Sequence, residues 1–404
     1  MKTTELVCSF CGKKRAEVKK LFSTETAAIC DECVKLCDNV LVQENAQNER
    51  KAFSHGLPRP QEISAFLDRY VIGQEAAKKT MAVALYNHYK RIERPIAKGV
   101  ELEKSNILLI GPTGSGKTLI AKRLARIMNV PFAVADATAL TEAGYVGEDV
   151  ESILSRLLAA ANFDVELAQK GIIYIDEIDK IAHKGESATT GRDVSGEGVQ
   201  QGLLKILEGA EIYVPVKGSR KNASAETVLF DTTHVLFIAG GAFVGLEEQV
   251  KKEHAKEMGF GRKGTQKAAD FKPQPKDLVR YGMIPEFVGR LPVIATLQPL
   301  SQADLVRILK EPKNALTAQY EALFELDGIE LVFEEEALER VAQLAYEREV
   351  GARGLRGILE EKMLPLLYEL PGREDVGTCR ITRAFLDGTA EAILTSTPKR
   401  QSHG

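Results

Sequence analysis

The sequence has 404 residues, of which 44% are hydrophobic and 27% are charged, and its formal net charge is −3 at pH 7. These values are typical of soluble globular proteins of roughly two to three domains. The small net charge provides no overall basic field for nucleic acid, and no apolar run approaches the ~20 residues that cross a bilayer. The chain begins Met1-Lys2-Thr3-Thr4-Glu5 without a signal-peptide core, so we expect a cytoplasmic protein.

Two Cys-x-x-Cys pairs lie near the N-terminus, one formed by Cys8 and Cys11 and the other by Cys30 and Cys33. Cysteines clustered in a reducing compartment indicate a metal rather than disulfides. Each pair can hold one edge of a tetrahedral Zn²⁺ through thiolates, so the pairs predict a closed, structural zinc site. A redox motif is the alternative, and the second pair argues against it. Cys37 is interpreted as a spare thiol on a following helix.

Residues 46–60 are polar and then rich in proline, which is typical of a mobile linker. We therefore expect residues 1–45 to form a separate zinc-binding domain. Apolar spacing predicts one helix from Gln61 and a second helix over residues 76–91.

The segment from Ser105 begins as an apolar strand and ends in a glycine-rich loop, Gly111-Pro112-Thr113-Gly114-Ser115-Gly116-Lys117-Thr118. It fits the pattern G-x-x-x-x-G-K-[ST], whose backbone N–H groups surround phosphate oxygens. Lys117 would place a positive charge against the β and γ phosphates, and the Thr118 hydroxyl would ligate Mg²⁺. A helical pattern starts at Leu119, so a helix N-terminus faces the anion. A plain glycine turn is the alternative, and the order strand, loop, helix argues against it.

A second apolar run, residues 171–175, ends in Asp176 and Glu177. Such a run fits a buried parallel strand whose carboxyl end meets the ligand crevice. Asp176 would hold Mg²⁺, and Glu177 would orient or deprotonate the attacking water. The run lies beyond the glycine-rich loop with one further strand, residues 130–136, between them, which makes the assignment more specific.

Weaker signals lie elsewhere in the chain. Many P-loop ATPases line the adenine pocket with an apolar corner like the one formed by Val71 and Ile72, although its spacing equally fits a core turn. Gly144-Tyr145-Val146-Gly147 suggests an exposed aromatic on a flexible loop, with an ordinary turn as the alternative. Residues 248–276 form a polar, lysine-rich insertion, and its apolar island, Met258-Gly259-Phe260, is a candidate docking point. Taken by itself, Arg290 follows a predicted helix and would be interpreted as a surface residue.

The order of strands and helices predicts an α/β P-loop ATPase domain with a parallel sheet over residues 61–296. From Leu297 the pattern changes to helix, strand and helix, which predicts a smaller α+β domain over residues 297–390. Residues 391–404 are expected to form a disordered tail.

Together these motifs resemble the ClpX family, the AAA+ unfoldase subunits of the Clp protease, and the resemblance covers nearly the whole chain. Its motifs occur in the family's order: the cysteine spacing, Gly111–Thr118, Gly144–Gly147, Ile175–Lys180, Gly191–Gly198, Ile284–Arg290 and Gly351–Arg356. Several of these motifs are weak singly, and the combination is specific. The HslU unfoldase is also related but lacks the cysteine module.

The resemblance implies a homohexameric ring around an axial pore, with ATP, Mg²⁺ and Zn²⁺ as cofactors. Such a ring would unfold tagged protein substrates and deliver them to a ClpP-type peptidase, and it would also act as a chaperone. The zinc domain would bind adaptor proteins. Neither a membrane nor nucleic acid is expected as a partner, and the chain carries no hydrolytic constellation for peptide bonds.

The resemblance also assigns roles to single residues. Tyr145 looks like the pore-loop aromatic that grips an unfolded chain, with Val146 packed beside it. Arg290 resembles the arginine finger that reaches the γ-phosphate of a neighbouring subunit, and Arg353 resembles the sensor arginine that reads the phosphate of its own subunit. The expected catalytic set is Lys117, Asp176, Glu177, Arg290 and Arg353.

This chain departs from the family pattern in two loops. The peptidase-docking loop usually reads Ile-Gly-Phe or Leu-Gly-Phe, whereas this chain has Met258 in the first place; methionine is apolar and flexible, so docking should survive. The pore-entrance loop usually reads Arg-Lys-His, and here it reads Arg220-Lys221-Asn222. Its two positive charges would still attract a C-terminal carboxylate.

Two other functions fit parts of the sequence. An unfoldase that works without a peptidase is one, and the Met258-Gly259-Phe260 island argues against it. A zinc-bearing nucleic-acid remodeller, such as a clamp loader, is the other. The basic residues of the cysteine module are balanced by acidic ones, which argues against DNA binding.

Overall fold

The structure is a computed structural model, and it describes residues 7–15, 18–23, 27–34, 56–93, 100, 102–141, 148–182, 196–215, 227–257 and 272–396. Within these residues, no helix has the length and apolar character needed to cross a bilayer. The chain divides into two compact units, Met1–Pro58 and Arg59–Gly404, which are described separately.

The first unit contains a small antiparallel hairpin of β1 (Leu21–Ser23) and β2 (Ala28–Cys30), in which Leu21 pairs with Cys30. A tight turn precedes it, because the Gly12 N–H donates to the Cys8 carbonyl and the Cys8 N–H donates to the Lys13 carbonyl. Its buried hydrophobic residues within the described part are Cys8, Ala28 and Cys30. So small a core offers little apolar burial to hold this unit together.

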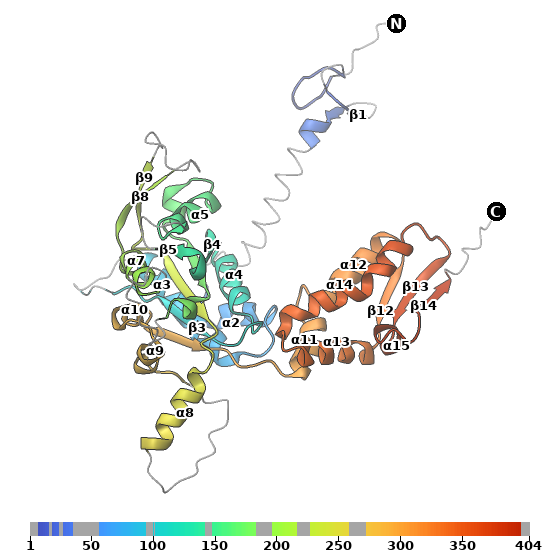
Figure 1. Cartoon of the computed structure of the whole chain (residues 1–404). Coiled ribbons are helices and arrows are strands. Elements are labelled where there is room, and N and C mark those ends of the chain that lie inside the picture. The colour runs from blue at the N-terminus through green and yellow to red at the C-terminus, as the bar shows by residue number, and fades with distance from the viewer. Residues whose placement is uncertain are drawn as a thin grey trace, which may run out of the picture. The chain divides into compact units, whose positions relative to one another are not determined.

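The second unit is built around a five-stranded parallel sheet, which confirms the predicted α/β class (Figure 1). Its strands, in spatial order, are β11 (Val293–Thr296), β3 (Ile107–Ile110), β10 (Leu236–Gly241), β7 (Ile172–Asp176) and β4 (Phe132–Asp136). The three central strands are apolar and buried along most of their length, as expected when helices cover both faces of a parallel sheet.

Helices cover both faces of this sheet. The helices of this part are α2 (Pro60–Asp68), α3 (Glu75–Glu93), α4 (Lys117–Met128), α5 (Ser152–Ala160), α6 (Val165–Ala168), α7 (Glu197–Glu208), α8 (Leu246–Glu257), α9 (Pro275–Tyr281) and α10 (Pro285–Gly289). On one face, Ile173 and Ile175 of β7 join a core with residues of α5 and α7. Side chains alternate along a strand, so Tyr174 lies on the opposite face, where α4 contacts β7 and β10.

Shorter elements complete this part. They are the parallel pair β5 (Leu140–Thr141) and β6 (Glu148–Asp149), the antiparallel hairpin β8 (Glu211–Pro215) and β9 (Thr227–Asp231), and the 3₁₀ turns η2 (Ala137–Ala139) and η3 (Ile178–Ile181).

The C-terminal part has a separate core, which confirms the smaller α+β portion of the predicted fold. Its elements are α11 (Gln302–Lys310), α12 (Leu316–Leu326), β12 (Glu330–Phe333), α13 (Glu335–Glu347), α14 (Gly351–Glu369), β13 (Val376–Ile381), α15 (Arg383–Leu386) and β14 (Ile393–Ser396). Their buried side chains, such as Leu305, Phe324 and Leu359, form one cluster. Figure 1 shows these helices beside the sheet β12-β13-β14.

One predicted boundary was wrong. Residues 391–404 were expected to be disordered, but β14 occupies Ile393–Ser396 and pairs antiparallel with β13, with Ile393 opposite Arg380. The open edge of β13 supplies hydrogen-bond partners to this short segment, which its own sequence does not reveal. The domain boundaries predicted at residues 45, 60 and 296 stay predictions.

Candidate nucleotide site and metal centre

The glycine-rich loop connects the end of β3 to the start of α4, as the sequence predicted. Gly114 and Gly116 have φ angles of 78° and 102°, a left-handed conformation that favours glycine. Gly111 is needed for a different reason, because a Cβ there would lie 2.8 Å from the Leu297 Cβ and 2.9 Å from the Leu297 carbonyl oxygen. The loop therefore passes closely over the chain that follows β11.

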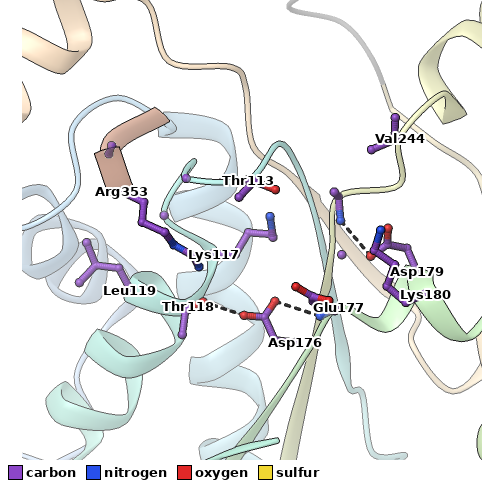
Figure 2. A pocket seen from close by; sticks show the side chains of 15 residues that line it. Thr113, Lys117, Thr118, Leu119, Asp176, Glu177, Asp179, Lys180, Val244 and Arg353 are labelled. Atoms are coloured by element: carbon purple, nitrogen blue, oxygen red, sulfur yellow. Dashed lines mark hydrogen bonds between the residues drawn. The ribbon is translucent and has the colours of Figure 1, made fainter. Parts of the chain in front are cut away.

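This loop borders a cavity of about 430 Å³ at the carboxyl ends of the parallel strands (Figure 2). The residues that line it are Thr113, Gly114, Gly116, Lys117, Thr118, Leu119, Asp176, Glu177, Asp179, Lys180, Gly241, Ala242, Val244, Ala352 and Arg353. The cavity thus brings the P-loop, the acidic end of β7 and the first turn of α14 together. It lies where a parallel α/β sheet is expected to bind its ligand.

The Asp176 carboxylate at the end of β7 accepts three hydrogen bonds from described residues. The Thr118 hydroxyl donates to Asp176 Oδ2 at 3.2 Å, and the Glu177 N–H donates to Oδ1 at 3.0 Å (Figure 2). The buried Tyr174 hydroxyl also donates to Oδ1, at 3.1 Å. Burial raises the pKa of Tyr174, and the Asp176 charge raises it further, so the phenol stays a donor. Glu177 has a φ of 55°, which turns the chain sharply after the strand.

Lys117 is nearly buried and is held by main-chain carbonyls. Its ammonium donates to the carbonyl oxygens of Gly111 at 2.7 Å and Pro112 at 3.0 Å. Burial lowers the pKa of Lys117, while the nearby Asp176 carboxylate acts in the opposite direction. A phosphate beside this ammonium would favour its charged form. The Thr118 hydroxyl and the Asp176 carboxylate face each other, and their oxygen atoms are suitable ligands for a hard cation such as Mg²⁺.

The end of β10 also contributes to the cavity through Gly241 and Ala242, which were not predicted from the sequence as site residues. The Ala242 N–H donates to Asp179 Oδ1 at 3.1 Å, so the ends of β10 and β7 are tied together. A signal for this contribution was present, because the apolar run of residues 235–239 ends in Gly240-Gly241. A third buried strand ending in small residues indicates another wall of the same crevice.

Several predicted residues lie elsewhere in the structure. Val71 and Ile72 are buried, and neither is among the described residues that line the cavity. Pro112 borders an adjoining cavity of about 380 Å³, and the Ser115 hydroxyl donates to the Pro112 carbonyl at 2.7 Å. The predicted residues of three loops fall outside the described part of the chain: Tyr145 and Val146; Arg220 and Lys221; and Met258, Gly259 and Phe260.

Arg290 lies at the opposite end of the sheet from the cavity. Its carbonyl accepts a hydrogen bond from the Asn106 side chain at 3.0 Å, and Asn106 immediately precedes β3. The Arg290 guanidinium forms an ion pair with Glu208 at 2.7 Å. Arg290 is therefore at the amino ends of the strands, whereas the P-loop is at their carboxyl ends.

The four predicted cysteine ligands meet in the first unit. The Sγ atoms of Cys8, Cys11, Cys30 and Cys33 all lie within 4.8 Å of one another. A Zn–S distance of ~2.3 Å places tetrahedral sulfurs about 3.8 Å apart, and the Cys11 and Cys30 sulfurs are 3.6 Å apart. The Cys30 N–H also donates to the Cys8 sulfur at 3.3 Å, which suits a thiolate. This donor set fits a closed zinc site.

Comparison with known proteins finds matching families for three parts of the chain. Residues 6–43 match the ClpX C4-type zinc finger, residues 102–294 match the AAA domain of the Cdc48 subfamily, and residues 300–382 match the C-terminal D2-small domain of ClpB protein. A relative from Wolinella succinogenes, "ATP-dependent Clp protease ATP-binding subunit ClpX 2", is 58% identical over 401 residues, which cover 98% of this chain and 99% of the relative. The "ATP-dependent Clp protease ATP-binding subunit ClpX" of Borrelia duttonii is 51% identical over 396 residues, which cover 96% of this chain and 92% of the relative.

Proposed function

Since this chain belongs to the ClpX family of AAA+ ATPases, we propose that it is an ATP-driven protein unfoldase and translocase that delivers tagged substrates to a ClpP-type peptidase. The chain is an ATPase, with ATP and Mg²⁺ as cofactors at the P-loop cavity and Zn²⁺ at the cysteine centre. The observation that carries the proposal is the cavity itself, because residues of the parallel-sheet part and of α14 line it together.

We assign the chemical roles from this geometry. Lys117 and the N-terminus of α4 hold the phosphates, and Thr118 and Asp176 hold the metal through their oxygens. Mg²⁺, when bound, neutralises charge on the phosphate oxygens. Glu177 lines the same cavity and orients the attacking water or accepts its proton.

Coupling of hydrolysis to movement depends on the contact between the P-loop and α14. Gly114 rests against the first turn of α14, so closely that a Cβ on it would lie 3.0 Å from the Val350 carbonyl oxygen and 3.1 Å from the Gly351 Cα. Arg353, in the same first turn, points into the cavity (Figure 2). Loss of the γ-phosphate would remove the anchor of Arg353, and the two parts would rotate as rigid bodies.

The position of Arg290 supports a ring assembly. An arginine finger must reach a phosphate, but Arg290 and the P-loop lie at opposite ends of the same strands. Arg290 can therefore serve only the nucleotide of another copy of the chain, and we propose a homohexamer. Glu208 holds the guanidinium until a neighbouring phosphate competes for it.

The proposed roles of the residues that contact protein substrates are based on residue chemistry and on similarity to the family. Tyr145 and Val146 would grip the substrate in the pore, and Arg220 and Lys221 would attract it at the entrance. Each pull acts on folds stabilised by only ~5–15 kcal/mol. The zinc domain would bind adaptors or substrates, and Phe10, which is 70% exposed, offers it an apolar contact surface. We propose a cytoplasmic location, where thiolate ligands stay reduced.

Docking to the peptidase is tested by Phe260→Ala, which removes the aromatic side chain of the Met258-Gly259-Phe260 island. We expect ATP hydrolysis to be unchanged and the affinity for a ClpP-type peptidase to fall roughly 30-fold, as for an interface hot spot. Degradation of a tagged protein at limiting peptidase measures the effect. Phe163→Ala is the matched control, because Phe163 is a half-exposed phenylalanine outside this insertion. Wild-type degradation by Phe260→Ala would refute the docking assignment, and unfolding without degradation by the wild type would favour the peptidase-independent remodeller.

A further inference from the structure

We propose that Tyr174 is a positioning residue for the metal ligand Asp176, and that Gly240 is a glycine because the phenol of Tyr174 occupies the space of its side chain. The inference rests on the proposed role of Asp176 in holding Mg²⁺. It adds two buried positions, on two different strands, to the machinery of ATP hydrolysis.

Strand geometry places the phenol next to the carboxylate. Tyr174 precedes Asp176 by two residues in β7, so both side chains leave the strand on the same face. Tyr174 is fully buried, and its hydroxyl donates to Asp176 Oδ1 at 3.1 Å. A buried hydroxyl without a partner is costly, and this phenol is satisfied by Asp176, with the Thr118 side chain also interacting with it.

The hydrogen bonds to Asp176 divide its two oxygens between two tasks. Oδ1 accepts from the Tyr174 hydroxyl and from the Glu177 N–H, which both belong to β7 and its turn. Oδ2 faces the Thr118 hydroxyl on the cavity side (Figure 2). A carboxylate oxygen accepts about two hydrogen bonds, so Oδ1 is fully engaged and Oδ2 is the oxygen directed toward a metal. Outer partners of this kind fix the orientation of metal ligands.

Gly240 supplies an independent observation on the neighbouring strand. In the β10–β7 pairing, Ile238 lies opposite Tyr174, so Gly240 lies opposite Asp176. A Cβ on Gly240 would lie 2.1 Å from the Tyr174 hydroxyl oxygen and 2.7 Å from its Cζ. The φ of Gly240 is outside the left-handed region, so the backbone does not require glycine there. We therefore infer that glycine is needed at this position because the phenol of Tyr174 occupies the space that a side chain would fill.

A packing role and a positioning role predict different results for Tyr174→Phe. A ring that only fills the core would keep nearly all its contacts as phenylalanine, and the metal site would be unaffected. If the hydroxyl positions Asp176, its removal would leave the ring packed but leave Oδ1 with the Glu177 N–H as its remaining described donor, so metal binding would weaken while nucleotide binding without metal would not. Metal dependence, rather than activity alone, therefore separates the two roles.

The test measures the affinity of the full-length chain for a fluorescent ADP in EDTA and over a series of Mg²⁺ concentrations. For Tyr174→Phe we expect the Mg²⁺ midpoint to rise at least about tenfold, as for other outer partners of metal ligands, with the EDTA affinity unchanged. Tyr89→Phe is the matched control, because the Tyr89 hydroxyl is also buried but donates to the Lys170 carbonyl at 2.9 Å. It should lower the Tm and leave the Mg²⁺ midpoint at the wild-type value.

Gly240→Ala gives a second, independent arm of the test. It should also raise the Mg²⁺ midpoint, and by less in the Tyr174→Phe background, because the closest clash, with the hydroxyl, is then absent. A wild-type Mg²⁺ midpoint for Tyr174→Phe, or strictly additive effects of the two substitutions, would overturn the positioning role of Tyr174 and leave the proposed metal site standing. A wild-type chain whose nucleotide binding does not respond to Mg²⁺ would instead overturn the proposed metal site on which it rests.

Discussion

Glu177→Gln should bind ATP as the wild type does and hydrolyse it at least about 100-fold more slowly, since a positioned general base contributes ~10²–10⁴ in rate. Glutamine keeps the size of the side chain and the sharp turn after β7, but it cannot accept a proton from water. The P-loop, Lys117 and the oxygen pair of Thr118 and Asp176 are untouched, so phosphate and metal binding should persist. Steady-state phosphate release and equilibrium nucleotide binding measure the two effects separately.

Glu166→Gln is the matched control for this experiment. Glu166 is an exposed glutamate in the first turn of α6 and does not line the cavity as the structure describes it, so its loss should leave turnover unchanged. Normal turnover by Glu177→Gln would show that another group activates water. Loss of nucleotide binding in the same variant would show that Glu177 acts on binding instead.

Cys8→Ser should release the zinc and unfold the first unit. Structural zinc contributes ~10–16 kcal/mol to the folding of small modules, and the described core of this unit is limited to Cys8, Ala28 and Cys30. Zinc content measured with a metal-sensitive dye should fall from one equivalent to below about half, and protease should cleave residues 7–34 rapidly. ATP hydrolysis should persist, because Arg59–Gly404 forms its own compact unit.

Cys37→Ser is the matched control for the zinc site, because Cys37 is not one of the assigned ligands. Cys37 is interpreted as a spare thiol, and it lies outside the described residues. This variant should keep its zinc and its resistance to protease. Retention of one zinc equivalent by Cys8→Ser, or its loss from Cys37→Ser, would contradict the assigned ligand set.

The parts of the site that were predicted from sequence are those in which chemistry acts over a few neighbouring residues. Phosphate binding requires glycines and a lysine at fixed spacing, so the loop from Gly111 to Thr118 stood out from the sequence. Thr113, Gly114 and the residues from Gly116 to Thr118 line the cavity. The acidic pair after β7 and each cysteine pair also consist of residues that are close together in the sequence. The sheet was also predictable, because its central strands are short apolar runs separated by helical patterns.

Contacts between distant segments were not predictable in this way. Nothing near Tyr174 in the sequence shows that its hydroxyl meets Asp176 beneath Gly240, because that contact depends on the pairing of β7 with β10. The pairing of β14 with β13 depends likewise on an edge formed elsewhere. The apolar corner at Val71 and Ile72 fitted two interpretations; the structure buries both side chains, and their contact with adenine stays a prediction.

The central claim is that hydrolysis at the P-loop cavity drives the unfolding of a protein chain. The most direct test follows the fluorescence of a folded, tail-tagged reporter mixed with the full-length chain, with and without a ClpP-type peptidase. We expect fluorescence to be lost only when ATP is present, permanently when the peptidase is added, and not at all with Glu177→Gln. Retained fluorescence with the wild type and ATP, under conditions in which ATP is hydrolysed, would contradict the claim and leave an ATPase that does other work.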